Sequence, residues 1–210
     1  MTVVPPQVPA SWTTYGQGST SRLAILLTDP DSSWLGLAHG LKSVGIPFRI
    51  TRDVHEALAH QVVLVYPMIS GKVLAPEALQ ALAEFPKAGG TLIGVQVLGG
   101  GLNQVFGFRD AVASRQRYGM RLAASDPLLA GLTDPRERQL RVDIRDKGLE
   151  VMGTYGYTES TAPLALFEDG TAAITQATYG RGPGLRDRIG SRVSVSEGVQ
   201  QSRRGTRTDL

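Results

Sequence analysis

The stretch from Gly89 to Phe106, GGTLIGVQVLGGGLNQVF, constrains the fold of this chain more than any other. A short apolar run between glycines is typical of a parallel strand that is covered on both faces. The glycines at 99–101 predict a turn after this strand and then the start of a helix. In open α/β sheets the ligand site lies where such strands end, so we expect the functional site near Gln96 to Asn103.

The residues before this stretch alternate between strand and helix patterns. Apolar runs at 22–27, 46–50 and 61–67 predict strands, and helical spacing or capping predicts helices at 34–44, 53–59 and 76–85. Strand–helix repeats of this length imply a parallel sheet with right-handed crossovers. After Phe106 the pattern changes to alternation, which predicts antiparallel strands at 138–145 and 149–157 and a hairpin across 163–178.

The two ends of the chain differ in composition from its middle. Residues 1–21 contain three prolines and predict an extended lead-in. They lack the basic and apolar regions of a signal peptide, and no run in the chain is long enough to span a bilayer, so we expect a cytoplasmic protein by default. Residues 183–210 hold six Arg against three acidic residues, which accounts for the net charge of +3. We interpret them as a disordered, solvated tail rather than a nucleic-acid-binding arm.

Two parts of the chain resemble one family. Residues 22–106 resemble the flavodoxin-like core of class I glutamine amidotransferase-like domains, and residues 160–182 resemble the closing hairpin of variants attached to carbohydrate-active enzymes. The resemblance is to the type found N-terminal to bacterial polysaccharide deacetylase domains. It implies an α/β fold, a flavodoxin-like mostly parallel sheet with helices on both faces and an antiparallel β extension, over residues 22–182. Order and spacing carry it, in the stretches LTDPD at 27–31, AHGLKS at 38–43, GIPF at 45–48 and FEDG at 167–170.

The resemblance places Gln96 where catalytic relatives have a cysteine nucleophile on a strand-to-helix elbow. Covalent catalysis needs a nucleophile and an adjacent base. The chain has no cysteine, and no histidine follows His60. The aspartate and histidine pairs of a deacetylase metal site are absent as well. We therefore expect a pseudoenzyme with no catalytic residues, no metal site and no cofactor.

The residues after Gly182 depart from the resemblance, which implies an apolar last strand there. Back-translating residues 182–191 and reading one nucleotide later permits the sequence RAYAIGLDLG. We hypothesise that residues 183–210 are a frameshift product and that the last strand is lost. The sheet would then end in an unpaired edge after Thr178, and such edges promote association.

The candidate ligand-binding residues lie at the predicted carboxyl ends of the strands. Each has a structural alternative. Thr28, Asp29 and Asp31 would turn the chain and cap a helix, Tyr66 would pack in the core, and Gly99 and Gly100 would form a tight turn. The spacing of the three histidines does not bring metal ligands together. The candidates are Thr28, Asp29, Asp31, Tyr66, Gln96, Gly99, Gly100 and Asn103.

These observations favour a non-catalytic accessory domain of a polysaccharide-processing protein, which binds carbohydrate or a partner domain such as a fused polysaccharide deacetylase. Two alternatives stay open. One is a small hydrolase that uses Asp29, Tyr66 and Gln96 without a thiol, and the other is a structural domain for dimerisation. We expect no nucleic-acid or membrane partner, while a homo-oligomer remains an alternative.

Overall fold

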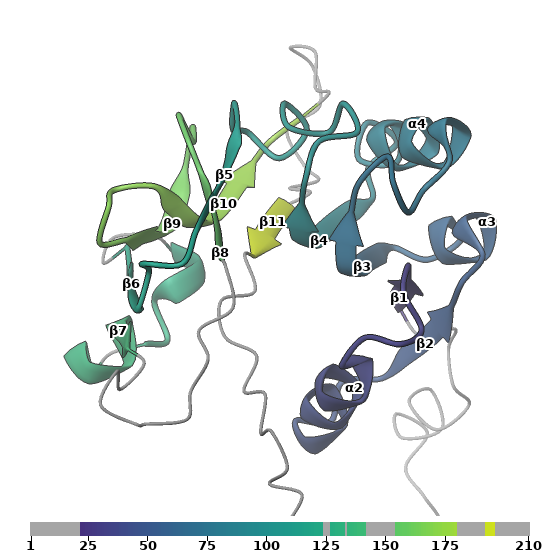
Figure 1. Cartoon of the computed structure of the whole chain (residues 1–210). Coiled ribbons are helices and arrows are strands. Elements are labelled where there is room, and N and C mark those ends of the chain that lie inside the picture. The colour runs from purple at the N-terminus through teal and green to yellow at the C-terminus, as the bar shows by residue number, and fades with distance from the viewer. Residues whose placement is uncertain (1–21, 124–126, 133, 142–153, 180–191, 196–210) are drawn as a thin grey trace, which may run out of the picture.

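The computed structural model describes residues 22–123, 127–132, 134–141, 154–179 and 192–195. The predicted lead-in at 1–21 lies outside the described residues, as does most of the predicted tail. One sheet runs through the described part of the chain and changes from parallel to antiparallel strands along its length (Figure 1). No helix in this part of the chain is long and apolar enough to cross a membrane.

Parallel strands form one end of the sheet, in the order β2–β1–β3–β4. Their side chains are largely buried because helices cover both faces of this part. Leu26 of the first strand pairs with Thr51 on one side and Val65 on the other. The strands are β1 (Leu23–Leu27), β2 (Phe48–Thr51), β3 (Val62–Ile69) and β4 (Thr91–Val97).

Three α-helices are present in the described residues, and two of them begin with recognisable signals. The Asp53 side chain caps one by accepting hydrogen bonds from the backbone N–H groups of His55 (2.7 Å) and Glu56 (3.1 Å). Another begins with Pro76, whose ring suits the first turn of a helix. The helices are α2 (Trp34–Ser43), α3 (Val54–Leu58) and α4 (Pro76–Glu84).

Antiparallel strands form the rest of the sheet, in the order β11–β10–β9–β6–β7. Strand β8 pairs with β10 and with β5, off this path. The hairpin predicted across 163–178 is confirmed, with Gly170 at φ +82° in its turn. The strands are β5 (Ala111–Ser114), β6 (Gly119–Leu122), β7 (Gln139–Arg141), β8 (Thr154–Tyr157), β9 (Pro163–Phe167), β10 (Ala172–Ala177) and β11 (Arg192–Val195), with 3₁₀ turns η1 (Pro127–Leu129) and η2 (Pro135–Arg138).

Three apolar clusters hold these elements together. The largest packs α3 and α4 against one face of the parallel strands and extends to Tyr157 of β8. A second lies under α2 on the opposite face and includes Tyr66 and Val95. A third joins β6, β9 and β10 around Phe167. The described antiparallel strands therefore have a core of their own.

The predicted flavodoxin-like fold is wrong. Strands outweigh helices in the described residues, and β5 to β10 form a large antiparallel sheet rather than a minor extension. The expected helix after β4 is replaced by turns. Those turns bury Leu102, Val105, Phe106 and Phe108 in the main core, so apolar side chains occupy the space that a helix would fill.

Strand β11 lies in the segment predicted to be a disordered tail, and it covers the sheet edge predicted to be unpaired. It lies between β4, to which it is parallel, and β10, to which it is antiparallel. The sheet therefore continues past β10, and the strand expected to be lost has a counterpart at Arg192–Val195. The sequence RVSV alternates polar and β-branched residues, a strand pattern that the excess of arginine in this segment obscures.

Candidate functional site

Thr28 joins the carboxyl ends of β1 and β3. Its backbone N–H donates to the Tyr66 carbonyl at 2.7 Å. Its hydroxyl donates toward the carbonyls of Met68 at 2.9 Å and Tyr66 at 3.1 Å. The hydroxyl is therefore used to hold two strands together.

Asp29 and Asp31 form the turn that leads to α2. The Asp29 carboxylate accepts from the Asp31 backbone N–H at 3.0 Å, and the Asp29 carbonyl accepts from the Ser32 hydroxyl at 2.5 Å. These are turn interactions. The three described histidines and the acidic residues form no group that can hold a metal ion in the described part of the chain.

Tyr66 and Gln96 lie in the strands themselves. The Tyr66 side chain is 4% exposed and packs in the cluster under α2. Gln96 is half-buried within β4, in register with Met68 of β3. Glu159 is the only non-glycine residue with a positive φ in the described residues, so Gln96 is not on a strained elbow. This differs from the geometry that the resemblance implied.

The amide after Gln96 is already hydrogen bonded. The Val97 backbone N–H donates to the Tyr157 hydroxyl at 3.2 Å in a buried setting. In hydrolases with a nucleophile elbow, the N–H that follows the nucleophile stabilises the oxyanion. Here the Tyr157 hydroxyl of β8 accepts the hydrogen bond of that N–H, which adds to the case against catalysis at Gln96.

The glycines after β4 form a turn with left-handed backbone, at φ +96°, +70° and +78° for Gly99, Gly100 and Gly101. Only glycine adopts three such conformations in succession without strain. Asn103 follows, and its side-chain N–H donates to the Arg109 carbonyl at 2.7 Å. Its other side-chain atom, Oδ1, is buried with no partner in the described residues.

A cavity of about 390 Å³ lies between the glycine turn and α4. Gln80 supplies the one polar side chain of its lining, so it offers an apolar surface with little to orient a ligand. Of the candidate residues, it includes Gly100 and none of Thr28, Asp29 and Gln96. Its lining consists of Gly71, Leu74, Pro76, Leu79, Gln80, Ala83, Gly100 and Gly101.

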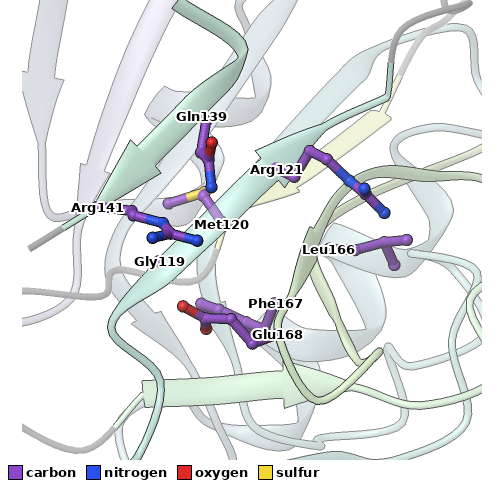
Figure 2. A pocket seen from close by; sticks show the side chains of 8 residues that line it. All are labelled: Gly119, Met120, Arg121, Gln139, Arg141, Leu166, Phe167 and Glu168. Atoms are coloured by element: carbon purple, nitrogen blue, oxygen red, sulfur yellow. The ribbon is translucent and has the colours of Figure 1, made fainter. Parts of the chain in front are cut away.

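A second cavity, of about 320 Å³, lies over the antiparallel strands β6, β7 and β9 (Figure 2). Unlike the first, its lining includes charged and amide side chains together with apolar ones. Its volume is near the lower end of the range of about 300–1,000 Å³ typical of ligand pockets. The lining residues are Gly119, Met120, Arg121, Gln139, Arg141, Leu166, Phe167 and Glu168.

The strand register explains why polar side chains gather around Gly119. Gly119 pairs with Arg141, while Arg121 pairs with Gln139 and Leu166. Because side chains alternate between faces, Gly119, Arg121, Gln139 and Arg141 share one face. A Cβ atom added to Gly119 would lie 2.9 Å from the Glu168 Oε1 and 3.0 Å from the Arg141 Cγ. Figure 2 shows Arg141 and Glu168 directed toward the space beside Gly119.

Arg117 supports this cavity from within the core. It is 3% exposed, and its Nη1 donates to the carbonyls of Val112 (2.8 Å) and Thr154 (3.1 Å). Its Nε donates to the Asp169 carboxylate at 2.7 Å, and its guanidinium lies over the Phe167 ring. Arg117 thereby fixes the turn that begins at Glu168.

Asp169 is held in its charged form by the same contacts. Its burial acts to raise the pKa, but hydrogen bonds from the hydroxyl and backbone N–H of Thr171, and the bond from Arg117, act against it. The pKa of Asp169 therefore lies below its ordinary value of 3.8.

None of the eight residues proposed from the sequence lines the β6–β7–β9 cavity. The structure brings Thr28 and Tyr66 together through the Tyr66 backbone carbonyl rather than its ring, and it places Asn103 with Arg109. The sequence places Glu168 within the predicted hairpin across 163–178 and not among the candidate ligand-binding residues. The alternating polar residues of GMRL in β6 and QLR in β7 indicate strands with one polar face, but whether those faces form one cavity depends on which strands pair.

No protein-family model matches the chain, and no curated protein matches it. Among solved structures, a β-galactosidase from Bifidobacterium adolescentis is similar at 19% identity, over 87% of this chain and 92% of that chain, with a TM-score of 0.32. A similarity at that TM-score carries no argument about fold or function.

Proposed function

We propose that this chain is a non-catalytic binding domain that takes carbohydrate in the β6–β7–β9 cavity. The observation that carries the proposal is the mixture of groups around Gly119. The guanidinium groups of Arg121 and Arg141 donate hydrogen bonds, the Glu168 carboxylate accepts them, and the Gln139 amide does both. Sugar hydroxyls need donors and acceptors together, and the C–H face of a sugar ring suits the apolar lining.

The described residues at the end of β4 form no catalytic arrangement, which supports binding rather than turnover. The chain has no thiol, Gln96 lies in a regular strand, and the Val97 N–H is engaged by Tyr157. The thiol-free hydrolase alternative gains no support, because Tyr66 is buried in an apolar cluster and Asp29 is used in its own turn.

The role as an accessory domain of a polysaccharide-processing protein rests on the sequence resemblance. The stretches at 27–31, 38–43, 45–48 and 167–170 support it through their order and spacing. A partner domain, such as a polysaccharide deacetylase, is the second kind of binding partner that this resemblance suggests.

Titration of the chain with neutral and charged oligosaccharides, followed by calorimetry, tests the proposal. Gln139→Ala should lower the affinity for the saccharide by about three- to tenfold, because it removes one or two hydrogen bonds. Gln80→Ala is the matched control, since Gln80 lines the other cavity. The proposal fails if no oligosaccharide binds, or if Gln80→Ala weakens binding and Gln139→Ala does not.

A second candidate function is structural association through exposed apolar side chains of α2 and of the segment that follows it. Leu35, Val44 and Ile46 are exposed by 57%, 69% and 41%, and exposed apolar side chains favour contact with another surface. Under this alternative the chain forms dimers in sedimentation velocity, and Leu35→Glu with Val44→Glu converts them to monomers. A monomer at all concentrations removes this candidate.

A further inference from the structure

The charges around the β6–β7–β9 cavity are unbalanced. Arg121 and Arg141 lie on one face, while Glu168 is the one acidic residue of the lining. Because Arg121 pairs with Gln139 and Arg141 is two residues further along β7, the two arginines are diagonal neighbours, about 7–8 Å apart at Cα. Figure 2 shows the Arg121 side chain extending toward Leu166 and the Arg141 side chain toward Gly119 and Glu168, so positive charge lies on two sides of the lining.

No carboxylate in the described residues forms an ion pair with either of these arginines. Three of the other exposed arginines in the described residues have one: Arg49 pairs with Glu56, Arg109 with Glu159, and Arg136 with Asp134. With its amide oxygen turned toward Arg141, Gln139 accepts from Nε at 2.8 Å and Nη2 at 3.0 Å. That contact orients Arg141 but does not neutralise its charge, because an amide is neutral.

We propose that the cavity binds an acidic saccharide, a sugar unit that carries a carboxylate, as in a uronic acid. This inference rests on the proposed carbohydrate-binding function and specifies its ligand class. The ligand carboxylate pairs with the guanidinium of Arg121, whose planar fork matches a carboxylate in two-point contact. Gln139 and Glu168 form hydrogen bonds with the neighbouring hydroxyls of the sugar.

The remaining lining argues for a sugar acid over a simple anion. Glu168 reaches over Gly119 and repels a dianion such as phosphate, but it accepts a hydrogen bond from a hydroxyl. Leu166 pairs with Arg121 across β6 and β9, so an apolar side chain lies next to the proposed carboxylate site. A ring with one carboxylate, several hydroxyls and a C–H face satisfies all of these groups.

The experiment uses the full chain and matched pairs of ligands. Oligomers of galacturonate, glucuronate and mannuronate are each compared by calorimetry with the same oligomer after carboxyl reduction. At least one acidic oligomer should bind about tenfold or more tightly than its reduced form, and its affinity should fall as salt increases from 0.05 to 0.5 M. Inorganic phosphate serves as a competitor.

Arg121→Gln should abolish most of the preference for the acidic oligomer, and Arg121→Lys should restore part of it. Arg52→Gln is the charge-matched control, because Arg52 is exposed and follows β2 at the other end of the sheet. Equal binding of acidic and reduced oligomers overturns this inference and leaves the proposed function standing. Competition by phosphate at comparable concentration also overturns it. Binding of neither form means that the proposed function itself has failed.

Discussion

The hydroxyl of Tyr157 accepts a hydrogen bond from the backbone N–H of Val97, which joins the end of β8 to the end of β4 across sixty positions of sequence. The Tyr157 ring also packs on Phe108, with 4.3 Å between ring centroids. This contact ties the antiparallel strands to the parallel strands at the position where an α/β enzyme would place its reactive group. Tyr157 thus stabilises the junction and engages the Val97 N–H.

Replacement of Tyr157 by Phe should lower the free energy of unfolding by about 1–3 kcal/mol, because the buried Val97 N–H loses its acceptor. Urea denaturation followed by tryptophan fluorescence measures the change. Tyr155→Phe is the control, since Tyr155 lies on the same strand and is partly exposed. Equal effects of the two substitutions would contradict the assigned role of the hydroxyl.

Replacement of Gln96 by Cys should produce an ordinary, poorly reactive thiol. No histidine follows His60 in the sequence, so no later base activates residue 96. The residue also lies in a regular strand and not at a helix N-terminus. The pH profile of iodoacetamide alkylation should give a thiol pKa near or above about 8.5. A pKa near 6 would reveal an activating environment and revive the catalytic interpretation.

The predictable parts of the fold were those with local signals. The apolar runs at β1, β3 and β4, the Asp53 cap and the Gly170 turn are each set by a few neighbouring residues. The predicted fold class was wrong because the antiparallel strands β6 and β7 are short and weakly patterned, and their side chains are exposed or only half-buried.

The binding cavity depends on information that no local pattern contains. Gly119, Arg141 and Glu168 are brought together by the register of three strands, and Arg117 is buried only because residues from β5, β8 and the hairpin turn surround it. Sequence spacing alone predicts neither the pairing register of β7, where a shift of one residue would move every side chain to the other face, nor the burial of an arginine.

Asp169 should make the chain less stable in acid. Because its folded-state pKa is lower than its ordinary value of 3.8, its contribution is fully present above that value. The contribution is lost as pH falls from 3.8 toward the lowered pKa. Urea unfolding between pH 7 and pH 2.5 should show a smaller loss of stability for Asp169→Asn than for the natural chain. Parallel profiles for the natural chain and Asp169→Asn would exclude this contribution.

Two glycine-to-alanine substitutions should have opposite effects on stability. At Gly94 in β4, a new Cβ would lie 2.7 Å from Val97 Cγ2 and 3.1 Å from Phe106 Cζ, so Gly94→Ala should cost about 1–3 kcal/mol through overpacking. At Gly40 inside α2, nothing lies within 4 Å, and Gly40→Ala should add roughly 0.5–1 kcal/mol by favouring the helix. Thermal and urea unfolding of both variants measures the difference. If Gly94→Ala proved as stable as Gly40→Ala, the turn after β4 could not be packed against that strand, and the junction at Val97 and Tyr157 would lose its support.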